Sequence, residues 1–187
     1  MQKIDVRIPY EPGGKLGWDY NRIMSETPHD WVLFLDHDVL LSTNQNWYHI
    51  CQKAIEQYPQ AGLFTCMTNK KHKYGSHEPD SPQTDVINNH RDFAKIVWSK
   101  HKDEYIEIEK SSGFFMLCNK KAWKEVGGFP GKAMFGEDLS YSKRLKTRGF
   151  SIKLIRGLYV YHDRHRDESL IDGLETTKEV RFREQGK

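Results

Sequence analysis

The sequence is short of cysteine, and the few cysteines that it has form no recognisable framework. Cys51, Cys66 and Cys118 are odd in number and far apart, so neither a closed set of disulfides nor a zinc-binding spacing is expected. All three fall in segments that we expect to be apolar. Buried free thiols in a reducing compartment are the simplest interpretation, and we therefore expect a cytoplasmic protein.

The sequence also has little excess charge and no long apolar run. Its 29 Lys and Arg against 26 Asp and Glu leave a net charge of +3, which is too small to indicate nucleic-acid binding, and we expect no nucleic-acid partner. No apolar stretch could span a bilayer and the N-terminus lacks a signal-peptide pattern, so no membrane span is expected. The 187 residues predict one domain, residues 1–165, followed by a charged tail, residues 166–187.

What the sequence does contain is an apolar pentapeptide that ends on two acidic residues. Residues 31–35 are large and β-branched, which is typical of a strand buried on both faces. Asp36 and Asp38 follow, and in an extended chain their side chains project to the same side. Two carboxylates that face one point suit a hard divalent cation that also carries a phosphate. Taken alone, however, the triplet is better explained as a polar strand end that caps the next helix.

Strands and helices are predicted to alternate along the chain. Apolar residues recur at helical spacing from Trp47 to Tyr58, which predicts an amphipathic helix closed by Pro59. The alternation indicates an α/β domain with a largely parallel central sheet flanked by helices. The expected strands cover residues 3–10, 31–35, 61–66, 113–118 and 152–161, and the expected helices cover residues 16–24, 47–58 and 137–148, with a short one around Trp123 capped by Asn119.

The segment from residue 68 to about residue 110 is long and polar. It holds four scattered histidines, which we interpret as surface residues because they lack tight spacing: His72, His77, His90 and His101. Loops of this length usually carry function or are disordered. We therefore expect this segment to bind the variable substrate.

Two later positions add polar side chains at the ends of predicted elements. Glu137 and Asp138 open a helix, where acidic residues are explained in general by the helix dipole. The dipole favours the charged form, so Asp138 is expected to stay ionised at neutral pH. His162 ends the last predicted strand, where a lone histidine is ordinary. Each of these positions alone is unremarkable, and their order in the chain is what draws attention.

The residues around these positions carry a resemblance to a known family. The segments concerned are Ile8-Pro9-Tyr10-Glu11, Phe34-Leu35-Asp36-His37-Asp38, Gly127-Gly128-Phe129, Phe135-Gly136-Glu137-Asp138-Leu139, Arg144-Leu145 and Gly149-Phe150, with His162 after them. In this combination, residues 3–165 resemble family 2 glycosyltransferases of the Rossmann-like GT-A fold. The resemblance implies transfer of a sugar from a nucleotide-diphosphate sugar to a carbohydrate or other hydroxyl acceptor.

The resemblance also implies a donor-binding region in the N-terminal third. Pro9, Tyr10 and Glu11 would line the nucleoside pocket, and Asp36 would lie near the ribose and the metal. Asn21 falls where the family often has an Arg-Asn pair, although the arginine is missing here. Lys15, in a Pro-Gly-Gly-Lys loop, is a candidate phosphate contact on its own chemistry, because such loops expose backbone N–H groups beside a positive charge.

The remaining implied roles concern the metal and the reaction. Asp38 and His162 would be the protein ligands of Mn²⁺ or Mg²⁺, with Asp36 beside them, and His165 is an alternative ligand in the same turn. Asp138 would be the catalytic base and Glu137 a contact to the acceptor. One base and direct displacement give inversion at the anomeric carbon. A retaining outcome stays open, because some related enzymes carry an acidic residue in a similar place.

The sequence departs from the family pattern between its first two strands. Only 25 residues separate Tyr10 from Asp36, whereas the family usually places another strand–helix unit there. The missing unit commonly ends in an aspartate that recognises the base, so the nucleotide is left open, with Glu11 or Asp19 as substitutes. We interpret the chain as a trimmed form of the domain. Two alternatives remain at this point: a nucleotidyltransferase on a similar scaffold, and a non-catalytic nucleotide-sugar-binding module.

Overall fold

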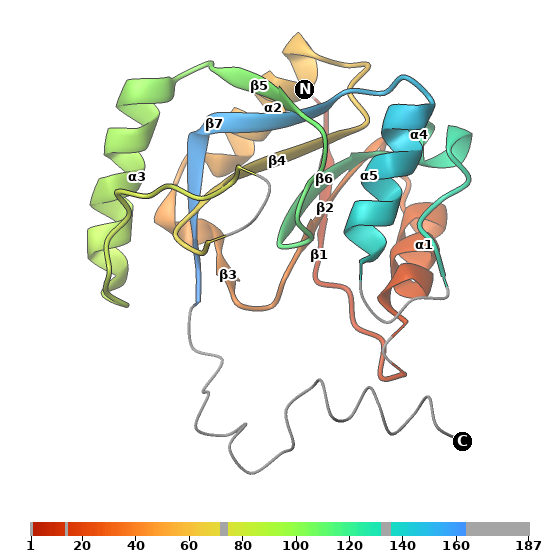
Figure 1. Ribbon diagram of the computed structural model, residues 1–187, viewed down its shortest axis with the longest axis horizontal. Coiled ribbons are helices and arrows are strands. Elements are labelled where there is room, and N and C mark those ends of the chain that lie inside the picture. The colour runs from red at the N-terminus through yellow and green to blue at the C-terminus, as the bar shows by residue number, and fades with distance from the viewer. Residues whose placement is uncertain (1, 14, 72–74, 132–135, 164–187) are drawn as a thin grey trace.

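A seven-stranded sheet forms the centre of the protein (Figure 1), whose computed structural model describes residues 2–13, 15–71, 75–131 and 136–163. The predicted tail and the alternative ligand His165 lie outside the described residues. The strands are β1 (Ile4–Arg7), β2 (Trp31–Leu35), β3 (Val39–Leu40), β4 (Leu63–Thr68), β5 (Tyr105–Ile108), β6 (Phe115–Asn119) and β7 (Ile152–His162). The helices are α1 (Leu16–Glu26), α2 (Trp47–Gln57), α3 (Ile87–His101), α4 (Lys120–Glu125) and α5 (Glu137–Thr147), with one 3₁₀ turn, η1 (Leu41–Thr43).

The strand order is β1-β2-β6-β4-β7-β3, and β5 pairs with β7. The pairs β1–β2 and β4–β7 are parallel, whereas β6 is antiparallel to both β2 and β4. It follows that β1, β2, β4 and β7 share one direction. The predicted α/β class, with helices around a central sheet whose strands mainly run one way, is confirmed. Sequence reasoning did not anticipate that β6 would be inserted antiparallel between parallel strands.

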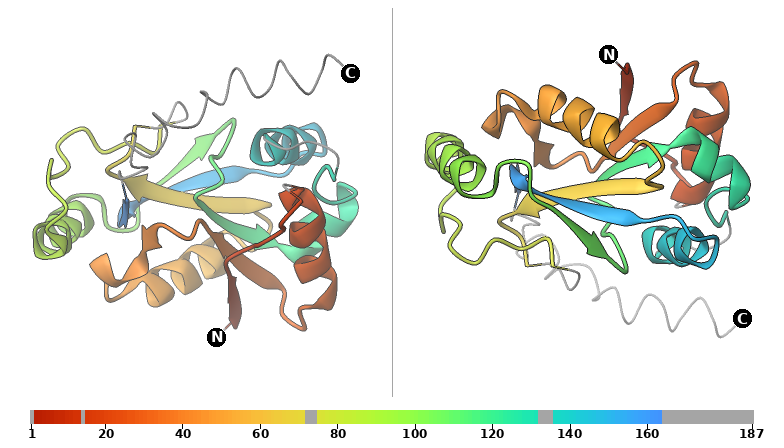
Figure 2. Two further views of the ribbon diagram at one scale, coloured as in Figure 1. Left: turned by 90° about the horizontal axis from the view of Figure 1, so that it is seen from below. Right: turned by 90° about the horizontal axis from the view of Figure 1, so that it is seen from above.

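Alternate residues of β2 face two separate cores. On one side, Leu33 and Leu35 of β2 pack with Ile50 and Ile55 of α2. On the other side, residues of α1, α4 and α5 pack against the alternate positions of β2, such as Phe34. Figure 2 shows α2 and α5 on opposite sides of the sheet. Because every residue of β2 is buried, the strand holds its carboxyl end in a fixed position.

The segment from residue 68 to residue 110 is not the long loop that the sequence suggested. It contains α3, which packs on β7, and β5, which adds an edge strand to β7. His90 is fully buried rather than on the surface, because its ring bonds the Tyr159 hydroxyl at 2.8 Å and the Thr84 carbonyl at 2.7 Å. Most of this segment therefore supports the sheet, which leaves less of it to contact a substrate.

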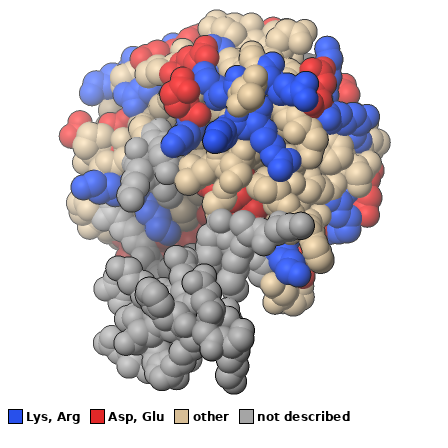
Figure 3. Space-filling model, turned by 45° about the vertical axis from the view of Figure 1, so that its right-hand side comes forward, with Lys and Arg blue, Asp and Glu red and all other residues tan. Residues whose placement is uncertain are grey.

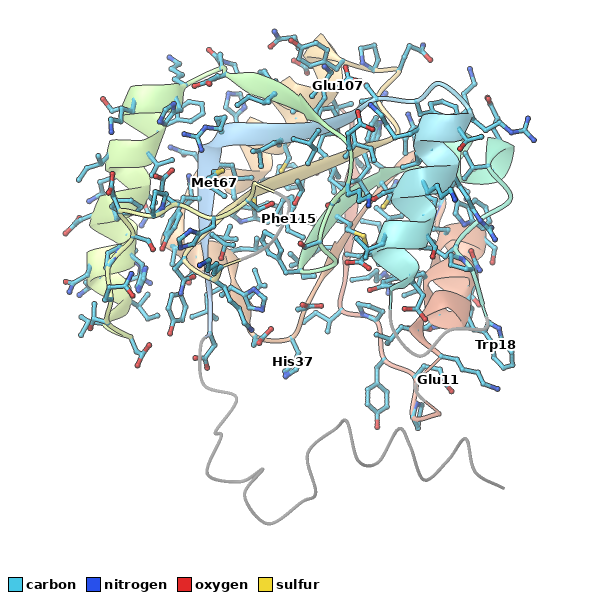
Figure 4. All side chains as sticks on the ribbon, viewed as in Figure 1. Glu11, Trp18, His37, Met67, Glu107 and Phe115 are labelled. Carbon is cyan, nitrogen blue, oxygen red and sulfur yellow. The ribbon has the colours of Figure 1, made fainter. Side chains whose placement is uncertain are left out.

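Several element ends that matter for a site lie together along one edge of the molecule. The carboxyl ends of β1, β2 and β7 and the N-terminal ends of α1 and α5 lie along the lower edge in Figure 1. The labelled side chains of Glu11, Trp18 and His37 occupy the same edge in Figure 4. In α/β sheets, ligands bind outside the carboxyl ends of the strands. None of the helices described is long and apolar enough to cross a membrane.

Candidate functional site

The acidic pair is positioned by the turn that follows β2. The Asp36 backbone N–H donates to the Phe114 carbonyl at 3.1 Å, and the Val39 N–H donates to the Asp36 carbonyl at 3.2 Å. The chain thus turns sharply from β2 into β3, and both carboxylates stay at its outer side. Their side chains are 43% exposed for Asp36 and 21% exposed for Asp38, so they remain open to a ligand.

His162 reaches the acidic pair because β3 pairs antiparallel with the end of β7. Val39 lies opposite His162 in this pairing, and the Asp163 N–H donates to the Asp38 carbonyl at 2.9 Å. The side-chain amide of Asn69 holds the His162 backbone on both sides, accepting from its N–H at 2.8 Å and donating to its carbonyl at 3.0 Å. The His162 ring is buried beside Phe114. The hydrogen bonds therefore fix the backbone of His162, and the packing of its ring against Phe114 restricts the side chain.

Asp36, Asp38 and His162 form one cluster, which we call the carboxylate–histidine group. Nε2 of His162 lies 3.1 Å from an Asp38 oxygen and 3.9 Å from an Asp36 oxygen. One ligand atom from each residue lies within 4.8 Å of the other two. Burial, followed by the charge of Asp38, raises the pKa of Asp36. Two carboxylates and an imidazole suit Mn²⁺ or Mg²⁺, and a cation there would offset the repulsion between the carboxylates.

A lysine that sequence analysis missed lies in the same cluster. The Lys70 ammonium is 3.3 Å from Nε2 of His162 and 3.7 Å from an Asp38 oxygen. Lys70 follows β4, and the parallel pairing of β4 with β7 brings it to this place. Its neighbours in sequence, Asn69 and Lys71, carry no motif that marks it. No sequence signal available here distinguishes Lys70 from the other lysines of that polar segment.

Asp138 stands at the start of α5, close to the carboxylate–histidine group. An Asp138 oxygen accepts the Leu139 N–H at 2.8 Å, and a Cβ placed on Gly113 would lie 3.6 Å from the other oxygen. Gly113 leads into β6, which pairs with β2. Burial raises the pKa of Asp138, whereas the sequence argument considered only the helix dipole, which lowers it. Desolvation outweighs the backbone donors here.

Glu137 is more deeply buried than its place in a first helical turn suggested. Only 5% of the residue is exposed, and its Oε1 has no hydrogen-bond partner among the residues that the structure describes. Burial raises the pKa of Glu137, and the adjacent Asp138 raises it further. A buried acceptor atom without a partner is costly to a fold and is common where a ligand completes the bonding.

Tyr20 connects the acidic residues of α5 with the acidic pair. Burial is the main cause that raises the pKa of Tyr20, and the charges of Asp36, Asp138 and Glu137 raise it further. These three carboxylates therefore act on one buried hydroxyl, which means that they share one region of the protein. The Tyr20 ring packs against Phe34 of β2, with ring centroids 4.8 Å apart. Sequence reasoning passed over Tyr20, although it lies beside Asn21.

The predicted nucleoside residues follow β1 along the same edge. Tyr10 is 78% exposed, and its N–H donates to Asp19 at 2.8 Å. Glu11 accepts the Lys15 N–H at 2.6 Å, so these two residues close a small loop. Pro9 is half-buried. Asp19 is buried and paired with Arg22, which leaves Glu11 as the freer of the two acidic residues suggested for contact with the base.

Asn21 and Lys15 are engaged differently from what the sequence suggested. The Asn21 carbonyl oxygen accepts from the Trp123 indole and from the Phe129 N–H, both at 2.8 Å, and its amide donates to the Phe129 carbonyl at 2.9 Å. These bonds tie α1 to the Gly127–Phe129 turn, so the polar atoms of the Asn21 side chain are engaged within the protein, and its role at a nucleotide stays a prediction. The Lys15 ammonium lies over the Trp18 ring, 4.4 Å from its centroid.

Much of the remaining positive charge lies away from the carboxylate–histidine group. Lys and Arg side chains gather on the face that carries α4 and α5 (Figure 3). Lys143, Arg144 and Arg148 of this face line a shallow hollow. Arg144 is partly engaged, because it donates to the carbonyls of Gly127 and Gly128. The mild basicity of the sequence is thus spread over an outer face, and Lys70 is the lysine found inside the acidic cluster.

The fold and the site together define an α/β protein with a carboxylate–histidine group at the carboxyl ends of its strands. No family model matches the sequence, and no curated protein matches it either. A solved structure with a similar arrangement is the crystal structure of S. aureus TarS 1-349, at 15% identity and a TM-score of 0.49. The match covers 78% of this chain and 39% of the TarS chain. A likeness as loose as this assigns neither a family nor an activity.

Proposed function

We propose that the protein is a metal-dependent glycosyltransferase of the GT-A type, which transfers a sugar from a nucleotide-diphosphate sugar to an acceptor hydroxyl with inversion. The observation that carries the proposal is the convergence of the Asp36 and Asp38 pair with His162, which is remote from them in sequence, close to the first turn of α5. Half-buried carboxylates gather there, and burial raises the pKa of Asp36 and of Asp138. Such clusters occur mainly where a ligand or a reaction requires them.

The donor set of the carboxylate–histidine group fits a divalent ion. Asp38 and His162 would hold Mn²⁺ or Mg²⁺ directly, with Asp36 on its other side. The ion would supply Lewis-acid neutralisation of the charge that develops on the leaving diphosphate. The protein residues orient the donor: the loop that contains Tyr10 and Glu11 is proposed to hold the nucleoside, with Lys15 near the phosphates.

Asp138 is proposed to act as the general base. It takes the proton of the acceptor hydroxyl while the new bond forms from that oxygen to the anomeric carbon and the bond to the diphosphate breaks. Its raised pKa suits this role better than an ordinary aspartate would, because a base with a higher pKa accepts a proton more readily. Glu137, with one carboxylate oxygen unpaired in the described part of the chain, is proposed to bind an acceptor hydroxyl.

The proposal is tested by thermal shift against UDP, GDP, ADP and CDP, each with and without Mn²⁺. We expect one of these diphosphates to stabilise the protein in a metal-dependent way, and then to be released from its sugar conjugate by the protein. Metal-dependent binding without turnover would favour a non-catalytic module. Release of inorganic pyrophosphate from a nucleoside triphosphate would favour a nucleotidyltransferase. The absence of any metal-dependent stabilisation would contradict the proposal.

A further inference from the structure

Lys70 is held in the carboxylate–histidine group by the structure around it. It directly follows Asn69, whose side-chain amide forms hydrogen bonds with both the N–H and the carbonyl of His162. The Lys70 ammonium also lies 3.4 Å from the carbonyl oxygen of Asp163. A register shift between Cys66 and Met67 alters the pairing of β4 with β7 just before this point. The backbone of Lys70 is therefore held beside His162, and its side chain reaches the group from there.

The ammonium lies beside the side chains that would bind a metal ion. A divalent ion coordinates carboxylate oxygen and imidazole nitrogen at about 2.0–2.2 Å. An ion at that distance from both Asp38 and His162 would lie next to an ammonium that is 3.7 Å from one of them and 3.3 Å from the other. Like charges so close in a partly buried place repel strongly. This repulsion disfavours a state in which the ion and the ammonium hold these positions together.

We propose that Lys70 is an internal cation that occupies the carboxylate–histidine group and competes with the divalent ion for it. The inference rests on the proposed metal site and adds the way in which that site is regulated. The Lys70 side chain is 30% exposed and has a long flexible stem, so it has room to swing away when the ion arrives. A donor diphosphate would give the displaced ammonium a new anion to contact.

The competition has a direct consequence for the order of binding. When the metal ion binds alone, the displaced Lys70 ammonium loses its contacts with Asp38 and His162 and gains no new anion. The affinity of the metal ion for the free protein is therefore reduced. Metal that arrives together with a diphosphate displaces the ammonium towards a phosphate, and the reduction is relieved. The negative charge of the acidic cluster thereby stays partly offset in the absence of donor, and the complete site forms when the donor is present.

The test measures the binding of Mn²⁺ alone, without nucleotide, by calorimetry. Lys70→Met keeps most of the apolar stem and removes the charge, and Lys70→Ala provides a second variant. The matched control is Lys71→Ala, since Lys71 is an exposed lysine next in the chain. We expect both Lys70 variants to bind Mn²⁺ more tightly than the wild type, by about fivefold or more, as is typical of site-to-site coupling, and the control to be unchanged. A thermal melt confirms that each variant is folded.

Three results would overturn the inference, and they separate it from the proposed function. If the wild type binds Mn²⁺ and the Lys70 variants bind it equally or more weakly, Lys70 does not compete, while the metal site stands. If neither the wild type nor the variants bind Mn²⁺, the metal site itself is wrong. Adding Asp38→Asn to Lys70→Met must abolish the gained affinity, and a gain that persists would place the ion elsewhere.

Discussion

Asp138 experiences opposing influences on its charge. Backbone N–H donors at the start of α5 favour the carboxylate, but burial disfavours it more, and the net effect raises the pKa of Asp138. The folded protein therefore holds a proton on Asp138 more tightly than the unfolded chain does. For this reason the ionised Asp138 costs stability at neutral pH, as is common for groups kept for a reaction.

The variant Asp138→Asn separates binding from reaction. It keeps an oxygen that can accept the Leu139 N–H but cannot take a proton, so we expect transfer to fall by about 100-fold or more. Nucleotide affinity should be unchanged, and the melting temperature at pH 7 should be no lower than that of the wild type. Diphosphate release and thermal shift are the measurements. Transfer close to the wild-type rate would show that another group is the base.

The pH profile follows from the sign of the same pKa shift. Protonated Asp138 cannot act as a base, so transfer should decline as the pH falls through its pKa. Since burial raises this pKa, the acid limb should lie above the ordinary aspartate value of 3.8. The kcat of the wild type, measured at saturating donor, should show this limb. An acid limb at or below the ordinary aspartate value would mean that the titrating group is not a buried carboxylate.

At the scale of elements, α1 packs very closely at Gly17 against the segment that follows α4. A Cβ at this glycine would overlap the Pro130 carbonyl oxygen and lie 3.2 Å from Cγ of Glu137. These contacts leave no room for a methyl group. The contact matters for the site, since it joins the N-terminal end of α1 to the first turn of α5.

We expect Gly17→Ala to destabilise the protein by about 1–3 kcal/mol through overpacking. The sign of this change in stability is informative, because replacing glycine by alanine within a helix ordinarily stabilises a protein by about 1 kcal/mol. Urea denaturation measures the change, and Ser25→Ala, at an exposed position of the same helix, is the control. A Gly17→Ala variant as stable as the wild type would show that α1 and the Pro130 region are not packed this closely.

The elements also show which patterns in the sequence were sufficient for prediction. Residues 31–35 predicted β2 because five large apolar residues in a row are typical of a strand buried on both faces. The helical spacing after Trp47 predicted α2 because a helix that buries one face repeats its apolar residues every three or four positions. In contrast, α3 was missed, because only His90, Ala94 and Val97 of its fifteen residues are buried. The two residues of β3 are too few for any period, although their pairing with β7 brings His162 to Asp38.

At the scale of the whole molecule, the site depends on contacts between distant parts of the chain. The meeting of Asp38 and His162 was expected from a family resemblance, since no spacing between residues so far apart predicts a contact. Lys70 was out of reach, because its place depends on how β4 is aligned with β7. The sheet order, with β2 and β7 separated by β6 and β4, makes the acidic pair and His162 meet through the β3 turn.

The most direct test of this account is the location of a bound ion. Crystals grown with saturating Mn²⁺ and a diphosphate that stabilises the protein should give an anomalous difference peak about 2.0–2.3 Å from an oxygen of Asp38 and from Nε2 of His162. The Lys70 ammonium should have moved away from both ligands. A peak at other residues, or no peak with the diphosphate in place, would contradict the central claim that this group is a metal centre.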